Sequence, residues 1–395
     1  MATKVRLLLS SSVLLLSTIW LIGCGHYSCG TTFGSPTCAP GTGGISTGTG
    51  GGNSIAVTAF VYFMDPSAGQ LALEGLNVAD SQTFAPVSSF VSPVLPQFTD
   101  GGIVMVNKSF LYLPFPGNGT LFGFSIDATS GALTAVPNSP YTNVSFPESI
   151  AADPKGAVLF VGGSAGITAF TVSPTDGSLT FVGLTPTTAG PTQLVTDGLG
   201  KYVYALTGST ISAFSYTSSG ALTAVPGSSF ASAKALTQIA GEASGTAIFG
   251  ITGTDTKVFV FSIAQAISPG ALTLSSTVPT TFSPVNLAVS PNGKFVYTFN
   301  ETTTGTSTTI DPMEGFSFSS GTLTELSGIS PFTALTATNG KFEQSGQFLF
   351  AEGVAPSSSV GGTFSFGANT STGALTDTLP SAGVPGTSFA VTDAP

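Results

Sequence analysis

Charged residues are scarce in this chain, and three residue types occur only once. Asp, Glu, Lys and Arg make up 7% of the 395 residues, against roughly 25% in an average soluble domain. The one arginine is Arg6, the one tryptophan is Trp20 and the one histidine is His26. Everything after residue 53 therefore lacks guanidinium and imidazole groups, which excludes an arginine clamp for phosphate and a histidine base there.

Basic residues are also few relative to acidic ones. Without the first 23 residues, seven lysines remain against 19 acidic residues, a formal net charge of −12. Nucleic acid and anionic lipid headgroups both require basic surface, so neither is expected as a partner. Hydrophobic residues form 42% of the chain and include 31 phenylalanines, which is enough for a folded core.

The N-terminal segment predicts export. Two basic residues precede the uncharged residues 7–22, which is the layout of a secretory signal. The segment ends in LIGC and resembles the lipobox of bacterial lipoproteins, which implies cleavage after residues 1–23 and lipid attachment to Cys24. A glycine rather than an aspartate follows this cysteine, which favours the outer membrane of the cell envelope. An ordinary cleaved signal and an uncleaved anchor remain open alternatives.

Residues 24–53 are predicted to form a flexible tether rich in glycine, serine and threonine. This segment contains Cys29 and Cys38, and an oxidising compartment permits a disulfide between them without requiring it. His26 lies nearby, which leaves a metal-binding alternative open. Folded sequence is expected over 54–395.

The rest of the chain consists of repeats. A turn of the type Ser/Thr-Gly-Ala-Leu-Thr recurs after an apolar run, and each run contains one position that can be aligned in all seven copies. The spacings between these positions are 48, 46, 44, 47, 55 and 48 residues, close to the period of a four-stranded propeller blade. The aligned residues are Leu76, Phe124, Phe170, Phe214, Phe261, Phe316 and Phe364.

The sixth repeat illustrates the strands expected in each unit. Strands are predicted over 285–290, 294–300, 313–319 and 322–326, with a Pro-Asn-Gly turn after the first and a Ser-Gly turn before the last. The first repeat lacks a first strand, whereas residues 386–392 form a surplus one at the C-terminus. We therefore predict that this last strand completes the blade that begins at Val57 and removes the free sheet edges.

The strings SPNGKFVYTFN (290–300) and ADPKGAVLFVGG (152–163) resemble the YVTN or lactonase-type β-propellers, a family that includes some 6-phosphogluconolactonases. The resemblance covers 54–395. It implies an all-β fold: a seven-bladed β-propeller with four antiparallel strands per blade, closed by the C-terminal strand. The enzymes of this family use His, Arg and Glu, of which only Glu is present here.

Carboxylates on the variable loops are the remaining candidates for chemistry. The weak catalytic candidates are Glu148, Glu301 and Glu352, each near the end of a predicted strand on the rim where loop lengths vary. The longest excursion, from Glu301 to Pro312, also brings Asp311 and Glu314 into a weak calcium hypothesis, because calcium prefers oxygen ligands. Solvated loop carboxylates are the competing interpretation.

Uncharged polar residues recur just before the apolar part of each first strand. They are expected to ring one mouth of the central channel and to hydrogen-bond a neutral ligand such as a sugar, or else to satisfy strand ends and channel water. Ser149, Gln193, Gln238, Asn286 and Ser388 hold this position, and Gly102 and Ala334 complete the seven.

An intact frame with few catalytic side chains favours a non-catalytic surface propeller that binds an envelope protein or polysaccharide through its variable rim. The alternatives are a lactonase-type hydrolase that uses carboxylates only, and a structural spacer. We expect a monomer without a cofactor.

Overall fold

The computed structural model describes residues 57–65, 70–77, 83–86, 95, 102–304, 307–327, 332–354, 361–378 and 389–393. All of these belong to one of the two compact units of the chain, Ser54–Pro395. Apart from one short 3-10 turn, η1 (Pro116–Asn118), every regular element in this part is a strand. The prediction of an all-β fold is confirmed.

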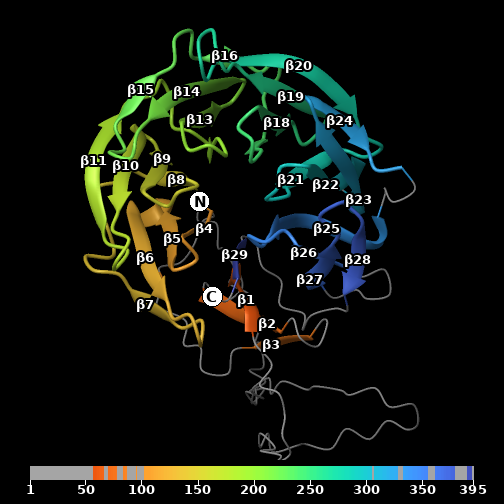
Figure 1. Ribbon diagram of the computed structural model, residues 1–395, viewed down its shortest axis with the longest axis horizontal. Helices are drawn as coiled ribbons and strands as arrows, with labels where there is room; N and C mark the ends of the chain where they lie inside the picture. The colour runs from red at the N-terminus through yellow and green to blue at the C-terminus, as the bar shows by residue number, and fades with distance from the viewer. Residues whose placement is uncertain are drawn as a thin grey trace, which may run out of the picture. The chain divides into compact units, whose positions relative to one another are not determined.

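The strands form antiparallel sheets in which neighbours in sequence are neighbours in space. Figure 1 shows these sheets following one another around a ring, with β4, β8, β21 and β29 toward the centre and β7, β11 and β20 outside. This arrangement is a β-propeller with four-stranded blades. Four of the sheets follow one another directly in the chain. The first contains β4 (Val104–Val106), β5 (Phe110–Phe115), β6 (Thr120–Ile126) and β7 (Leu133–Ala135), and the second contains β8 (Pro147–Ala152), β9 (Val158–Gly163), β10 (Gly166–Val172) and β11 (Leu179–Thr185). The third contains β12 (Gln193–Thr196), β13 (Tyr202–Thr207), β14 (Thr210–Tyr216) and β15 (Leu222–Ala224), with β16 (Phe230–Ala231) added to β14, and the fourth contains β17 (Gln238–Gly241), β18 (Ala247–Ile251), β19 (Lys257–Ile263) and β20 (Leu272–Pro279).

The blade count differs from the prediction of seven. The described residues form six sheets, because one of them has eight strands. In it, Pro312 and Met313 of β23 pair with β25 and join two four-strand sets. These sets are β21 (Pro284–Val289), β22 (Phe295–Thr304), β23 (Ser307–Ser319) and β24 (Thr322–Glu325), then β25 (Phe332–Phe342), β26 (Phe348–Val354), β27 (Gly361–Ala368) and β28 (Leu375–Thr378).

The excursion predicted between Glu301 and Pro312 is mostly strand. β22 runs to Thr304 and β23 starts at Ser307, and the two pair from Glu301 opposite Ile310 to Thr304 opposite Ser307. The segment is rich in threonine, whose branched side chain favours the extended conformation. This extension makes β23 13 residues long, which gives it the reach to pair with β25.

The ring is closed as predicted. The strand β29 (Phe389–Asp393) pairs antiparallel with β1 (Val57–Asp65), and Val391 lies opposite Val61. The same sheet continues through β2 (Gln70–Asn77) and β3 (Thr83–Pro86). The two ends of the folded part therefore share one sheet, which removes the free edge that β1 otherwise presents.

The core lies between consecutive four-strand units. Six clusters of buried apolar side chains occur, and each combines residues of two neighbouring units. One example joins Phe60 and Tyr62 of β1 to Leu111 and Phe124 of the next sheet. The recurrent aromatic residues are thus packing residues between sheets.

Buried tyrosines of the second strands tie one unit to the next. Tyr112 Oη donates to the carbonyl of Gly177 at 2.5 Å, and Tyr204 Oη donates to that of Gly270 at 3.1 Å. Equivalent bonds join Tyr62 to Gly131 and Tyr297 to Gly373. Burial raises the pKa of these hydroxyls above its ordinary value, so they remain donors.

These bonds explain the glycine of the repeated turn. Gly177 has φ +70° and Gly270 has φ +89°, which is backbone that favours glycine. A Cβ on Gly177 meets Phe110 Cδ1 at 2.3 Å, and one on Gly270 meets Tyr202 Cε1 at 2.4 Å. The turn therefore needs a residue without a side chain at this position in order to pack against the aromatic rings of the preceding unit.

A buried polar residue ends most first strands and holds the turn that follows. Glu242 accepts backbone N–H bonds from Ser244 at 2.6 Å, Thr246 at 2.5 Å and Ala247 at 3.1 Å. Glu343 and Asp197 accept equivalent bonds from their own turns. Burial favours a raised pKa for Glu242, but the bonds from Thr246 and Ser244 outweigh it and the pKa is lowered.

Candidate functional site

The polar residues predicted to ring the channel lie at matching places in the first strands. Strand register fixes the equivalence: Ser149, Gln193, Gln238 and Asn286 pair with the residue two places beyond the central aromatic of the second strand. All four, together with Gly102, line cavities of the molecule. The structure therefore brings these candidates together. Ser388 lies outside the described residues.

Ala334 does not hold the seventh position, and the prediction for it was wrong. Asn339 pairs with Glu352, just as Asn286 pairs with Phe299. The signal lies in the following turn: Asn339 precedes the turn residue Glu343 by four places, as Asn286 precedes Ser290. The sequence lacks the Pro-Asn-Gly string at this turn, which hid the alignment.

The ring amides bond around the channel from one unit to the next. Gln193 Oε1 accepts from the backbone N–H of Ile239 at 2.6 Å, and Gln238 Oε1 accepts from that of Leu287 at 2.7 Å. Gln238 Nε2 also donates to Asn286 Oδ1 at 3.0 Å. Because a backbone N–H can only donate, the orientation of both glutamine amides is fixed.

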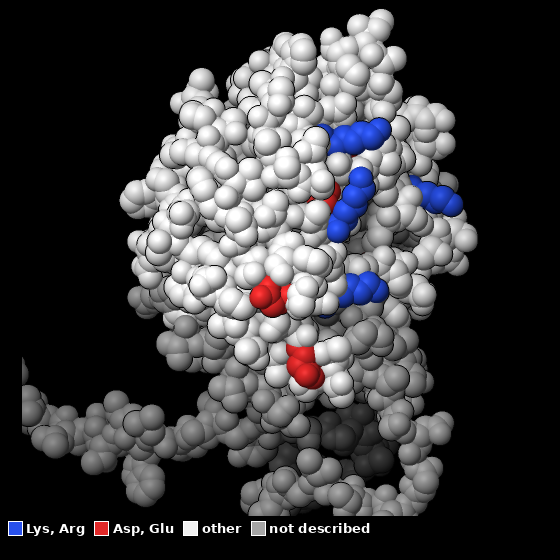
Figure 2. Space-filling view, turned by 60° about the vertical axis from the view of Figure 1, so that its left-hand side comes forward, with Lys and Arg blue, Asp and Glu red and all other residues white. Residues whose placement is uncertain are grey.

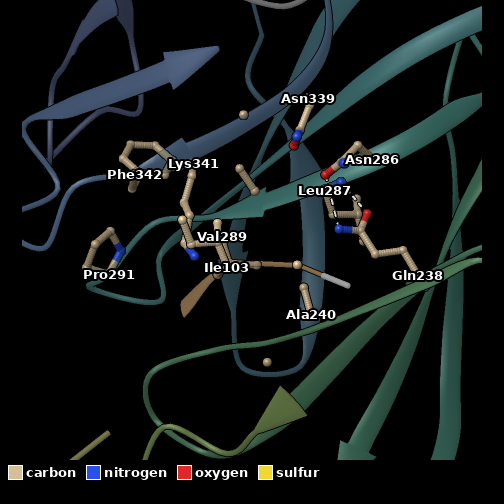
Figure 3. Close-up of a pocket in the computed structure, with 14 residues that line it drawn as sticks. Ile103, Gln238, Ala240, Asn286, Leu287, Val289, Pro291, Asn339, Lys341 and Phe342 are labelled. Atoms are coloured by element: carbon tan, nitrogen blue, oxygen red, sulfur yellow. Dashed lines mark hydrogen bonds between the residues drawn. The ribbon is translucent and has the colours of Figure 1, made fainter. Parts of the chain in front are cut away.

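Two cavities adjoin this ring. The first has a volume of about 390 Å³ and the second about 330 Å³, and both are lined by Gly102, Ile103, Gln238 and Asn286. The first also includes Asn339, Lys341 and Phe342, whereas the second includes Glu148, Ser149 and Gln193. Figure 3 shows the first cavity, with the Gln238–Asn286 pair on one side and Lys341 on the other.

Lys341 is a functional candidate that the sequence reasoning missed. It lies two residues beyond Asn339 on β25 and is exposed to the cavity. Protein surrounds this position although solvent reaches it, and the resulting loss of hydration lowers the pKa of its ammonium group. Four other lysines, Lys108, Lys155, Lys201 and Lys294, lie exposed at or beside the turns between first and second strands.

Most of the described surface visible in Figure 2 is uncharged. Figure 2 shows lysines close to one another on one face, among few acidic side chains and a large area of other residues. The buried carboxylates of the turns lie in the same part of the fold as the turn lysines. The lysines there offset those charges, so the turns do not form a strongly basic surface.

The three carboxylates predicted as weak catalytic candidates lie in different settings. Glu148 is exposed and lines the second cavity, and Glu301 is half-buried on β22. Glu352 is half-buried on β26, opposite Asn339, and burial raises its pKa to about 7. The raised pKa of Glu352 suits proton transfer near neutral pH.

Two of the three carboxylates of the calcium hypothesis, those of Asp311 and Glu314, accept internal hydrogen bonds. Glu314 is buried and accepts from the backbone N–H of Thr281 at 2.7 Å and from Asn300 Nδ2 at 3.3 Å. Asp311 accepts from Thr302 Oγ1 at 2.5 Å. Glu301 directly follows Asn300 in β22, so the Glu301 side chain points to the face of the sheet opposite to that of Asn300.

Within the described ranges, no three His, Cys, Asp or Glu side chains are close enough together to hold a metal ion. No helix in the same ranges is long and apolar enough to cross a bilayer. Cys24, Cys29 and Cys38 lie outside the described residues.

Comparison with solved structures identifies the class of fold. A candidate 6-phosphogluconolactonase from Bacteroides uniformis superposes with a TM-score of 0.63 at 20% identity, covering 85% of this chain and 99% of its own. A second candidate 6-phosphogluconolactonase, from Bacteroides fragilis, gives a TM-score of 0.63 at 17% identity, covering 86% and 99%. The periplasmic gluconolactonase of Pseudomonas aeruginosa gives a TM-score of 0.63 at 16% identity, covering 86% and 99%.

The chain therefore has the fold of the lactonase-like β-propellers. No family model matches the sequence, and no curated protein matches it. At these identities the likeness extends to the fold alone.

Proposed function

We propose that the central channel of this propeller binds a small polyhydroxylated molecule of the sugar or sugar-lactone class. The observation that carries the proposal is the fixed orientation of the ring amides. Gln193 and Gln238 use their oxygens as acceptors for backbone N–H groups. Asn286 uses its oxygen for Gln238.

The amino groups of the ring are left as donors for a ligand. In the described part of the chain, Gln193 Nε2 and Asn286 Nδ2 donate no hydrogen bond to protein atoms. Donors held in place at a cavity favour a ligand rich in acceptor oxygens. Hydroxyl, ring and lactone carbonyl oxygens all meet that requirement.

The cavity next to the ring has a suitable size and lining. Its volume of about 390 Å³ falls in the range of about 300–1,000 Å³ that is usual for small-molecule sites. Leu287, Val289 and Phe342 add apolar surface for the carbon faces of a sugar ring. The superposed proteins are named as a gluconolactonase and candidate 6-phosphogluconolactonases, and these names refer to sugar lactones, which belong to the same ligand class.

Titration calorimetry of the purified protein with glucose and glucono-1,5-lactone tests the proposal. We expect binding that Asn286→Ala weakens about tenfold, because the variant loses a donor and removes the acceptor of Gln238 Nε2. Asn143→Ala, which changes an exposed asparagine outside both cavities, is the matched control. Binding that is equal in the two variants contradicts a site at the amide ring.

Lactone hydrolysis is a second candidate function, and one observation favours it. The raised pKa of Glu352, about 7, leaves a carboxylate able to accept a proton from water near neutral pH. Water then adds to the lactone carbonyl, the ring C–O bond breaks, and the leaving oxygen takes a proton to give the hydroxy acid. Release of acid from glucono-1,5-lactone above the spontaneous rate, lost in Glu352→Gln but not in Glu325→Gln, supports this function. An unchanged rate in Glu352→Gln excludes it.

A partner-binding scaffold, our first expectation from the sequence, differs in where the ligand lies. It requires an envelope protein or polysaccharide on the variable loops, whereas the cavity proposal requires a small molecule inside the channel. Competition between soluble glycans and glucose in the same titration separates the two. Long glycans that bind without displacing glucose favour the rim.

We also propose that the eight-stranded sheet contains two blades, so that the propeller has seven. Phe295 and Tyr297 of the first set pack against Phe342 and Leu349 of the second, as side chains do between separate sheets elsewhere. The Tyr297–Gly373 bond repeats the link between consecutive units. An experimental structure in which β23 and β25 pair along their whole length contradicts this count.

Finally, we propose that residues 1–23 are removed, that residues 24–53 are the tether, and that Cys24 carries the lipid of an exported, envelope-anchored protein. The basis is the LIGC sequence alone. Labelling with a fatty-acid analogue in the producing bacterium should be lost in Cys24→Ser and kept in Cys29→Ser. Label retained in Cys24→Ser contradicts the proposal.

A further inference from the structure

Lys341 interrupts a pattern that the other first strands share. Strand register places it opposite Phe350, the central aromatic of β26. The residues at the same place in five other units are small or apolar, and none is charged: Val104, Ala151, Val195, Ala240 and Ala288. A long cationic side chain therefore extends into the channel at this one place among the described first strands.

The described residues around Lys341 provide no opposite charge. Among the described residues that line the cavity, none is acidic, and Ile103, Val289, Pro291 and Phe342 are apolar. In Figure 3 the Lys341 side chain extends beside Val289 and Ile103, away from the amides. An ammonium group in such a place gains most from an anion that enters the cavity.

The lowered pKa of Lys341 agrees with this geometry. It records the loss of hydration that the charged amine suffers inside the channel. A bound anion restores the favourable interaction of the charged form and raises the pKa again. Lys341 is an exposed residue that lines the cavity, so an anion can reach it without a rearrangement of the fold.

The spacing of Lys341 and Asn339 along the backbone of β25 sets the approximate length of the ligand. Lys341 follows Asn339 by two residues in β25, which is roughly 6–7 Å along a strand. A six-carbon chain or ring covers that distance. One end of such a ligand then meets the ammonium group, while oxygens at the other end meet the donors of the ring.

We propose that Lys341 forms a carboxylate subsite of the channel cavity, so that the preferred ligand is a small hydroxylated carboxylic acid in its anionic form. The inference rests on the proposed function and names the ligand class of that site. A single ammonium group balances one negative charge, which suits a carboxylate better than a phosphate dianion, since the described lining offers no second cation.

Calorimetry with matched pairs of ligands tests the subsite. Gluconate and glucose share several hydroxyl groups and differ in the carboxylate, whereas hexanoate and hexanol lack this series of hydroxyl groups and also differ in the carboxylate. We expect wild-type protein to bind gluconate at least tenfold more tightly than glucose, and hexanoate more tightly than hexanol. Lys341→Met should abolish both preferences while glucose binding remains.

The control variant is Lys294→Met, which changes an exposed lysine of a turn outside both cavities. It should keep both preferences, and Lys341→Arg should keep most of each. A preference for the anions that survives in Lys341→Met overturns the subsite. Tighter binding of glucose 6-phosphate than of gluconate overturns the assignment to carboxylates.

These measurements also distinguish the carboxylate subsite at Lys341 from the sugar-binding function on which it rests. Equal binding of gluconate and glucose, with loss in Asn286→Ala, contradicts the subsite and leaves the sugar site intact. Binding of hexanoate that depends on Lys341, with no binding of glucose, contradicts the sugar site and supports the subsite. The absence of binding by any of these probes contradicts both.

Discussion

At the scale of single residues, buried carboxylates stabilise the turns of this molecule. Glu242 is buried, and its two oxygens collect bonds from the backbone and hydroxyl groups of Ser244 and Thr246 and from the backbone of Ala247. These donors are close to the side chain in sequence, so the motif is local. Residue type does not predict this turn motif, because Ser290 performs the same task in another unit with a hydroxyl group.

Removal of the Glu242 side chain should destabilise the fold. Glu242→Ala leaves backbone N–H groups of a buried turn without an acceptor, which costs about 1–3 kcal/mol. The pKa of Glu242 is lowered in the folded state from its ordinary 4.5, so the stabilisation is present above pH 4.5 and is lost as pH falls further. Urea titrations at pH 7 and at pH 3.5 should show a smaller difference between variant and wild type at the lower pH.

A difference that stays constant between the two pH values contradicts this account. It would mean that the Glu242 carboxylate stabilises the turn equally in both protonation states. Glu325→Ala is the control, because that carboxylate is exposed on the surface of β24.

Glu352 should have the opposite effect on the pH dependence of stability. Burial raises its pKa to about 7, so the folded state retains a proton that the unfolded state releases near pH 4.5. Stability then falls as pH rises from 4.5 to 7. Glu352→Gln should match wild type at pH 4.5 and melt at a higher temperature at pH 8, and equal melting temperatures at pH 8 contradict the raised pKa.

At the scale of elements, the sequence predicts strands well where pattern and turn chemistry agree. The strand expected over 285–290 is β21 (Pro284–Val289), and that over 322–326 is β24 (Thr322–Glu325). The extension of β22 and β23 was missed, because a run of threonines with one glycine is typical of both loops and strands. Only the pairing partner across the hairpin decides between them.

The channel residues also include some that the sequence revealed and some that it did not. Asn286 was found because it precedes a turn with a clear Pro-Asn-Gly signal, whereas Asn339 and Lys341 precede Glu-Gln-Ser-Gly. The buried Glu343 performs the task of Ser290 there by a different chemistry. An alignment that follows hydrogen-bonding roles recovers both channel residues, and one that follows residue identity does not.

The bond between a second-strand tyrosine and the next unit should be a measurable link between elements. Tyr204→Phe removes only the hydroxyl group that donates to Gly270 and leaves a buried carbonyl without this partner. We expect a loss of about 1–2 kcal/mol in unfolding free energy, measured by urea denaturation. Tyr202→Phe, at a partly exposed position of the same strand, should change it by less than about 0.5 kcal/mol.

Equal effects of the two tyrosine changes contradict a specific role for the link. Sequence alone cannot reveal this bond, because Phe160 and Phe249 hold the same place in other units without a hydroxyl group. The ring packs in the same way with either residue. The hydrogen bond is an addition to that packing.

At the scale of the whole molecule, closure joins the two ends of the folded chain. Deletion of 386–395 removes β29 and leaves β1 with an unpaired edge. The shortened protein should aggregate and lose cooperative unfolding, measured by light scattering and thermal denaturation. A monomer that melts like the intact protein contradicts the importance of closure.

Closure also creates the channel that contains the proposed binding site. The ring brings Gln193, Gln238, Asn286 and Lys341 to one axis although 148 residues separate the first from the last. No local pattern in the sequence indicates that these residues lie close together in the fold; only the number of repeats indicates it. The site is therefore a property of the complete ring.

The central claim is that a small hydroxylated ligand binds inside the channel. Titration calorimetry of gluconate into wild-type, Asn286→Ala and Lys341→Met proteins tests it most directly. We predict binding to wild type, weakened about tenfold by each change, with each variant folded by circular dichroism. Gluconate affinity that is equal in all three proteins, or absent from wild type, contradicts the account.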